Sequence, residues 1–240
     1  MSSKPPSWAS DPLSAYLDSF ATNQHACFVH LPELYRYLVE VDRVFRALLS
    51  NLDETPEWFA SFFARRSLSA FLAASALALG GAVAEVYPVL RSCLEQALYG
   101  LHISADPERG NLWLNRHAGP SSKGQLVRTF RTGALIATVG ERDKPLSVSV
   151  SEIYEDLIDR GAHPNERGLM TTSAIEQDES RIRLSVTFLT GDSPVYRVAL
   201  INTCRVGVAS IALCRLIFPE PFERLGLKDS FLALRKRAAV

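Results

Sequence analysis

The sequence predicts a mainly α-helical fold, a multi-helix bundle of six to eight helices with one β-hairpin before the last long helix. Apolar residues recur at three- and four-residue spacing along most of the chain, and proline and glycine separate these periodic segments. Polar and apolar residues alternate over residues 181–189, a pattern typical of a strand. We expect a disordered tail at residues 1–10 and a single helical domain over residues 11–240.

Composition narrows the classes of function. Lysine plus arginine and aspartate plus glutamate number 26 each, so the formal charge is zero and nothing indicates nucleic acid as a partner. The first ten residues lack the apolar core of a secretory signal. The cysteines stand singly within apolar runs, which is typical of reduced, buried thiols in a cytoplasmic protein. They are Cys27, Cys93, Cys204 and Cys214.

The N-terminal quarter of the chain predicts a short helix, a loop and a long helix. The short helix, residues 13–21, follows the capping residue Asp11, and a strongly amphipathic helix covers residues 31–50. The loop at residues 25–30 has an H-x-C-x-x-H spacing that suits a metal ion. Because no fourth ligand stands nearby in the sequence, we expect no metal and no cofactor.

The next helix, residues 56–79, begins with aromatic residues and ends rich in alanine. It overlaps the uncharged stretch 67–84, whose length raises the alternative of a membrane span. Large apolar residues are few in that stretch, so we expect a closely packed core helix rather than a membrane contact. Gly80 and Gly81 predict a break, because each glycine costs about 1 kcal/mol of helix propensity relative to alanine.

The central helix is expected over residues 82–103, with Pro88 as its start or as a kink. Arg91, Glu95 and Tyr99 recur every four residues and therefore share one face. Apolar residues cover the adjoining faces, as is typical of a helix at the centre of a bundle.

The second half of the chain predicts more helices and the hairpin. His163 precedes Pro164 and is therefore biased toward an extended conformation. We expect the strand at residues 181–189 to pair with residues 195–198. Helices are expected after Asp106 and over residues 121–139, 146–160, 199–218 and 230–237.

Arg91 and Glu95 have two interpretations. In the first, they form a buried ion pair that fixes the register of the helices, because burying an unpaired charge is costly. In the second, Arg91 binds an anion and Glu95 acts as an acid or base in a polar pocket. The candidate catalytic residues are then Glu95, Tyr154 and His163, and the candidate ligand-binding residues are Arg91, Glu95, Tyr99 and His163.

The segment Val-Leu-Arg91-Ser-Cys-Leu-Glu95, with Tyr154 and His163-Pro164 later in the chain, resembles a group of uncharacterised bacterial all-helical proteins. Those proteins carry an Arg-Ser-x-x-Glu helix and a later Tyr…His-Pro segment. The resemblance covers roughly residues 70–218 and implies a helical fold without implying an activity. Helical RNA-cleaving proteins of toxin and defence systems have an arginine followed four to six residues later by histidine, and the pair Arg160 and His163 is too close for that pattern.

We expect a soluble regulatory or interaction module that forms a homodimer, or binds another protein, through an apolar helix or the hairpin. The alternative is a hydrolase or nuclease of a bacterial toxin or defence type that uses a polar cluster on the central helix. The sequence contains no glycine-rich phosphate loop, no G-x-S-x-G elbow and no H-E-x-x-H motif.

Overall fold

The computed structural model describes residues 4–50, 52, 55–177 and 181–240. Within these ranges lie twelve α-helices, one π-helical turn and one two-stranded antiparallel hairpin. The prediction of a mainly α fold is confirmed, and the predicted number of six to eight helices is wrong. Residues 1–3 of the expected tail lie outside the described ranges, and in the remainder Lys4 and Trp8 contact Asp18 of the first helix.

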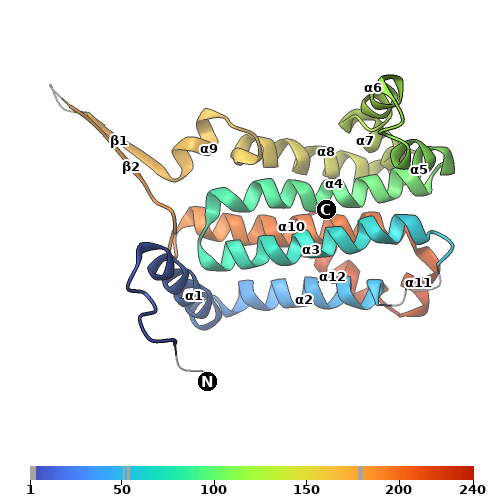
Figure 1. The fold of residues 1–240 in the computed structure, drawn as a ribbon. Coiled ribbons are helices and arrows are strands. Elements are labelled where there is room, and N and C mark those ends of the chain that lie inside the picture. Colours follow the sequence, from blue (N-terminus) through green and yellow to red (C-terminus); the bar gives the residue numbers. More distant parts are fainter. Residues whose placement is uncertain (1–3, 51, 53–54, 178–180) are drawn as a thin grey trace.

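Four long helices lie side by side and form the body of the molecule (Figure 1). They are α2 (Pro32–Leu49), α3 (Trp58–Gly80), α4 (Val83–Ser104) and α10 (Pro194–Ile217). Helix α4 packs against both α3 and α10, and its leucines are fully buried, so it is the central helix that its apolar circumference predicts. It begins at Val83, which places Pro88 inside the helix.

Two of these helices resemble membrane spans. Among the described residues, α3 and α10 are long and apolar enough to cross a membrane by length and composition alone, which is a weak indication because the core helix of a soluble protein passes the same test. In the bundle, 78% of the most apolar 18-residue stretch of α10 is buried, and 33% of the corresponding stretch of α3.

Helix α1 (Pro12–His30) lies across one end of the bundle and packs against α2 and α3. The expected loop at residues 25–30 is wrong, because no glycine or proline interrupts the chain before Pro32 and the helix continues to His30. Cys27 is buried while His25 and His30 are exposed, so the three side chains do not face a common site.

The predicted break at the two glycines is confirmed, since α3 ends at Gly80 and Gly81 adopts φ 85°. Both glycines also permit close approach of other segments. A Cβ at Gly80 would overlap the ring of Phe20 in α1, and one at Gly81 would overlap the carbonyl of Thr190. The Thr190 amide donates to the Gly81 carbonyl over 2.8 Å, which fixes the chain that leads into α10.

A second layer covers α4. It consists of α5 (Pro107–Leu114), α7 (Thr132–Arg142), α8 (Lys144–Leu157) and the π-helical turn η1 (Ile158–Ala162), and α6 (Pro120–Thr129) packs on α5. The single helix expected over residues 121–139 is divided at Phe130, which leaves the helical conformation and is only 6% exposed. Two helices, α11 (Pro219–Arg224) and α12 (Lys228–Ala238), follow α10.

The hairpin precedes the last long helix, as predicted, but one of its two strands was predicted wrongly. Strand β2 (Ile182–Val186) lies in the expected stretch, and its partner is β1 (Ser173–Gln177), which follows α9 (Glu166–Thr171). Residues 195–198 belong to α10, because the Ser193 hydroxyl caps that helix and Pro194 occupies its first position. The hairpin projects away from the bundle (Figure 1).

Candidate functional site

Arg91 and Glu95 form an ion pair on α4, with Arg91 Nε donating to Glu95 Oε1 over 2.9 Å. The pair is half-buried rather than buried, since 26% of the Arg91 side chain and 34% of the Glu95 side chain are exposed. Burial disfavours the charged guanidinium, but the hydrogen bond and the charge of Glu95 outweigh it and raise the pKa of Arg91.

Tyr154 of α8 joins this pair. Its hydroxyl donates to Glu95 Oε1 over 2.8 Å and accepts from Thr132 Oγ1 over 3.2 Å, and its ring centre lies 5.3 Å from the guanidinium carbon of Arg91. Burial raises the pKa of the Tyr154 phenol, and the carboxylate of Glu95 raises it further, so the hydroxyl remains a donor at neutral pH. Arg91 and Tyr154 both donate to Oε1 of Glu95, and Oε2 of Glu95 accepts no hydrogen bond from the described residues.

Tyr99, one turn further along α4, belongs to an aromatic cluster. Its ring centre lies 4.9 Å from that of Phe130 and 6.1 Å from that of Phe63. The cluster borders a pocket of about 570 Å³ between α3, α4 and α5. The pocket is lined by Phe59, Phe62, Phe63, Arg66, Glu95, Gln96, Tyr99 and Trp113. Glu95 therefore belongs both to the polar cluster and to the pocket wall.

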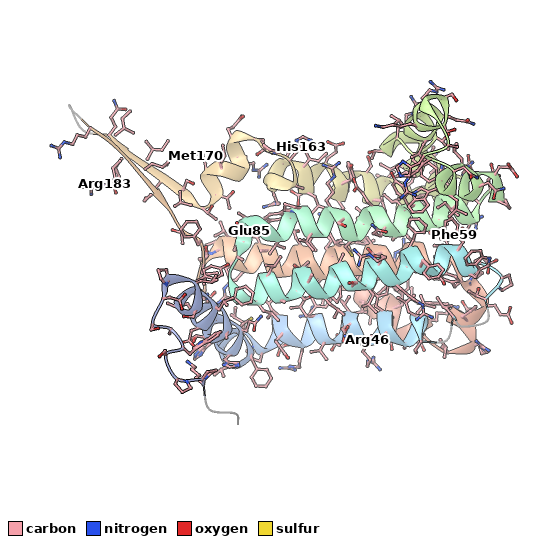
Figure 2. All side chains as sticks on the ribbon, viewed as in Figure 1. Arg46, Phe59, Glu85, His163, Met170 and Arg183 are labelled. Atoms are coloured by element: carbon pink, nitrogen blue, oxygen red, sulfur yellow. The ribbon has the colours of Figure 1, made fainter. Side chains whose placement is uncertain are left out.

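His163 does not join these residues. It has the extended conformation expected before Pro164, with φ −134° and ψ 145°, and its side chain is exposed. It directly follows η1, and Figure 2 shows it on the layer of helices that covers α4. Within the described part of the chain, no hydrogen bond or ion pair connects His163 to Arg91, Glu95 or the two tyrosines.

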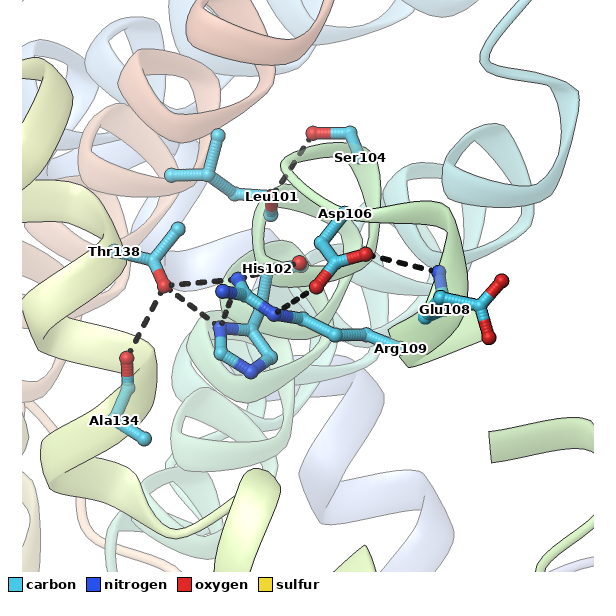
Figure 3. Close-up of polar contacts among 8 residues, drawn as sticks. All are labelled: Leu101, His102, Ser104, Asp106, Glu108, Arg109, Ala134 and Thr138. Carbon is cyan, nitrogen blue, oxygen red and sulfur yellow. Dashed lines mark hydrogen bonds and ion pairs between the residues drawn. The ribbon is translucent and has the colours of Figure 1, made fainter. Parts of the chain in front are cut away.

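A second polar cluster on α4 surrounds His102, which the sequence did not single out (Figure 3). His102 is 3% exposed, and its Nδ1 lies 2.7 Å from Thr138 Oγ1 and 3.1 Å from Nη1 of Arg109. Asp106 forms an ion pair with Arg109 at 3.5 Å. Because a guanidinium only donates, Nδ1 is assigned as the acceptor and Nε2 carries the ring proton. That buried Nε2 has no hydrogen-bond partner among the described residues.

The His102 ring is held neutral. Burial, and after it the positive charge of Arg109, lowers the pKa of His102 from 6.5 to about 4. The cluster ties α4 to α5 and α7, and we assign it a structural role on that ground. One signal could have pointed to His102, because it stands seven residues after Glu95 and so lies on the same helix face.

Neither the arrangement of possible metal ligands nor similarity to known proteins indicates a function. Among the described residues, no group of three or more histidine, cysteine, aspartate or glutamate side chains is placed to hold a metal ion. Comparisons with protein-family models, with curated protein sequences and with solved structures find no match. The catalytic and ligand-binding roles assigned to Glu95, Tyr154, Arg91, Tyr99 and His163 therefore stay predictions.

Proposed function

We propose that the protein is an interaction module and that its docking element is the hairpin, residues 173–186, which binds a second copy of the chain. We call this hairpin the arm. The observation that supports the proposal is the strand register, which sorts the side chains of the arm into two unlike faces. One face carries the exposed apolar residues Ile175, Ile182, Leu184 and Val186, with relative exposures from 47% to 71%, together with Ser173 and Gln177. The other consists of Ala174, Glu176, Arg183 and Ser185, with an ion pair of 3.8 Å between Glu176 and Arg183.

The arm and its flanking residues expose an apolar surface that approaches the size of a standard interface. An isolated two-stranded hairpin is marginal in water, so a covering partner stabilises it. Leu169, Met170 and Phe188, close to the arm in the chain, are also at least half exposed. Together with the four apolar residues of the arm, at roughly 100 Å² each, they supply about 700 Å², close to the ~800 Å² per partner of a standard interface.

Charge favours a second copy over a lipid surface. The arm has three carboxylates and two arginines, so two arms meet with little net repulsion. Charged side chains at this density oppose insertion of the arm into a bilayer. Packing around a two-fold axis would let the same apolar face serve both partners.

Sedimentation velocity at up to about 100 μM, a concentration that detects affinities near −5 to −6 kcal/mol, tests the proposal. We expect a dimer for the native chain, a monomer for Leu184→Glu, and a dimer for the matched control Ser185→Glu, which adds the same charge to the opposite face. Because the Thr187 amide donates to the Thr172 carbonyl over 2.8 Å, residues 173–186 can be replaced by a two-residue linker, and this variant should also be monomeric. A monomeric native chain, or equal effects of Leu184→Glu and Ser185→Glu, would overturn the proposal.

The alternative of a hydrolase or nuclease has less support. Glu95 is paired with Arg91, and its nearest titratable neighbour, Tyr154, has a raised pKa and keeps its proton. Among the described residues, His163 forms no hydrogen bond with Glu95, and its exposed side chain gives no support for proton exchange between them. We therefore expect His163→Ala to leave any hydrolytic or nucleolytic activity unchanged.

A further inference from the structure

The pocket between α3, α4 and α5 has aromatic walls. Trp113 lies edge-on to Phe63 and Phe59, with ring centres 5.3 and 5.9 Å apart, and Phe62 is 58% exposed. The volume of about 570 Å³ lies within the range of small-molecule sites, which are typically apolar with a few placed polar groups. Faces and edges of aromatic rings favour a flat ring as the occupant.

Three polar side chains also line this pocket: Arg66, Glu95 and Gln96. Glu95 is held in place by Arg91 and Tyr154 through Oε1, so Oε2 is an oriented acceptor that needs no reorganisation to bind a donor. Arg66 is exposed and makes no hydrogen bond or ion pair with the described residues, so its guanidinium is available to an anion.

We infer that this pocket binds a flat aromatic ring that carries an N–H donor and an anionic substituent. The ring stacks within the aromatic walls, the N–H donates to Glu95, and the anion pairs with Arg66. A simple cation fits less well, because the charge of Glu95 is balanced by Arg91. The pocket includes Phe59, at the opposite end of the molecule from Arg183 of the arm, so binding here is independent of the proposed dimer (Figure 2).

Four small probes separate the three features of this ligand. Indole-3-acetate has the flat ring, the N–H and the anion. Indole-3-acetamide lacks the anion, naphthalene-1-acetate lacks the N–H, and cyclohexylacetate lacks both the N–H and the flat ring, so its comparison with naphthalene-1-acetate isolates the ring. Isothermal titration of the full chain should give the highest affinity for indole-3-acetate and a loss of about tenfold for each missing feature, as expected when a charge-assisted hydrogen bond or a stacking surface is removed.

Variants assign each feature to its residue. Arg66→Gln should make indole-3-acetate and indole-3-acetamide bind alike, whereas Arg65→Gln, which removes the same charge from the neighbouring residue outside the pocket lining, should preserve their difference. Phe62→Ala should weaken all the flat probes, and because Phe62 is largely exposed its thermal melting should match that of the native chain. The inference is overturned if the native chain binds no probe at millimolar concentration, binds all four alike, or responds equally to Arg66→Gln and Arg65→Gln.

Discussion

The two polar clusters of α4 share a helix face but differ in their surroundings. His102 is 3% exposed, and its Nδ1 is enclosed by Arg109 and Thr138, whereas the Glu95 side chain is 34% exposed and borders the aromatic pocket. The Nδ1 of the enclosed His102 can find partners only in the protein, and its Nε2 has none among the described residues, whereas the partly exposed Glu95 can keep an acceptor for a ligand. Burial therefore separates a cluster that stabilises the fold from one that can meet a ligand.

The largest expected effect is in the enclosed cluster. His102→Ala leaves a cavity and removes the ring nitrogen that Arg109 and Thr138 contact, so we expect the free energy of unfolding to fall by about 3 kcal/mol. Urea denaturation at neutral pH measures this change. A loss below about 1 kcal/mol would contradict the structural role of His102.

Acid should weaken the same cluster. Because the pKa of His102 falls from 6.5 to about 4 on folding, the unfolded chain binds a proton between these values that the folded chain does not. Proton binding by His102 in the unfolded chain has no effect on stability above about pH 7. As the pH falls toward 4, it lowers the free energy of unfolding by about 2 to 3 kcal/mol in total.

The matched control is His102→Asn, which keeps an acceptor near the position of Nδ1 and does not titrate. Urea denaturation of both chains from neutral pH to about pH 4 should show the native chain losing more stability than the variant. Parallel pH profiles for the two chains would show that His102 is not the group responsible.

A smaller effect is expected in the open cluster. Arg91→Ala removes a half-exposed ion pair and the contact with the Tyr154 ring, so we expect a loss of about 1 kcal/mol. Thermal melting followed by circular dichroism measures it. If Arg91→Ala unfolded the protein, the two clusters would be equally structural and the comparison would fail.

The smallest effect on stability is expected for Glu95→Gln, which keeps an oxygen acceptor for Arg91 and Tyr154. We expect the free energy of unfolding to change by about 0.5 kcal/mol or less. The same substitution should reduce the affinity for indole-3-acetate about tenfold, because the charged acceptor is lost. A large loss of stability with unchanged affinity would reverse the roles assigned to the two clusters.

Local spacing explains what the sequence could predict. The central position of α4, the Arg91 and Glu95 pair and the break at Gly80 and Gly81 each depend on residues close together in the chain. The pairing follows from four-residue spacing on a helix, and the break follows from the low helix propensity of glycine.

Tertiary contacts explain what the sequence could not predict. His102 is bound by Arg109 of α5 and Thr138 of α7, and the walls of the pocket come from three helices. The hairpin prediction failed because Pro194 is compatible with a turn and with the first turn of a helix, and the Ser193 cap decides between them. Strand β1 has no clear alternation of its own, so only its pairing with β2 identifies it.

The four cysteines make helix opening measurable without added probes. Each is at most 2% exposed, and burial raises the pKa of each thiol, so a thiol reagent meets neither an accessible sulfur nor a thiolate while its helix is packed. Cys27 lies on α1 at the end of the bundle, whereas Cys93 and Cys214 lie on the central helices α4 and α10. The rate at which each sulfur is labelled therefore reports how often its own helix separates from the bundle, and we expect α1 to open first and the central helices last.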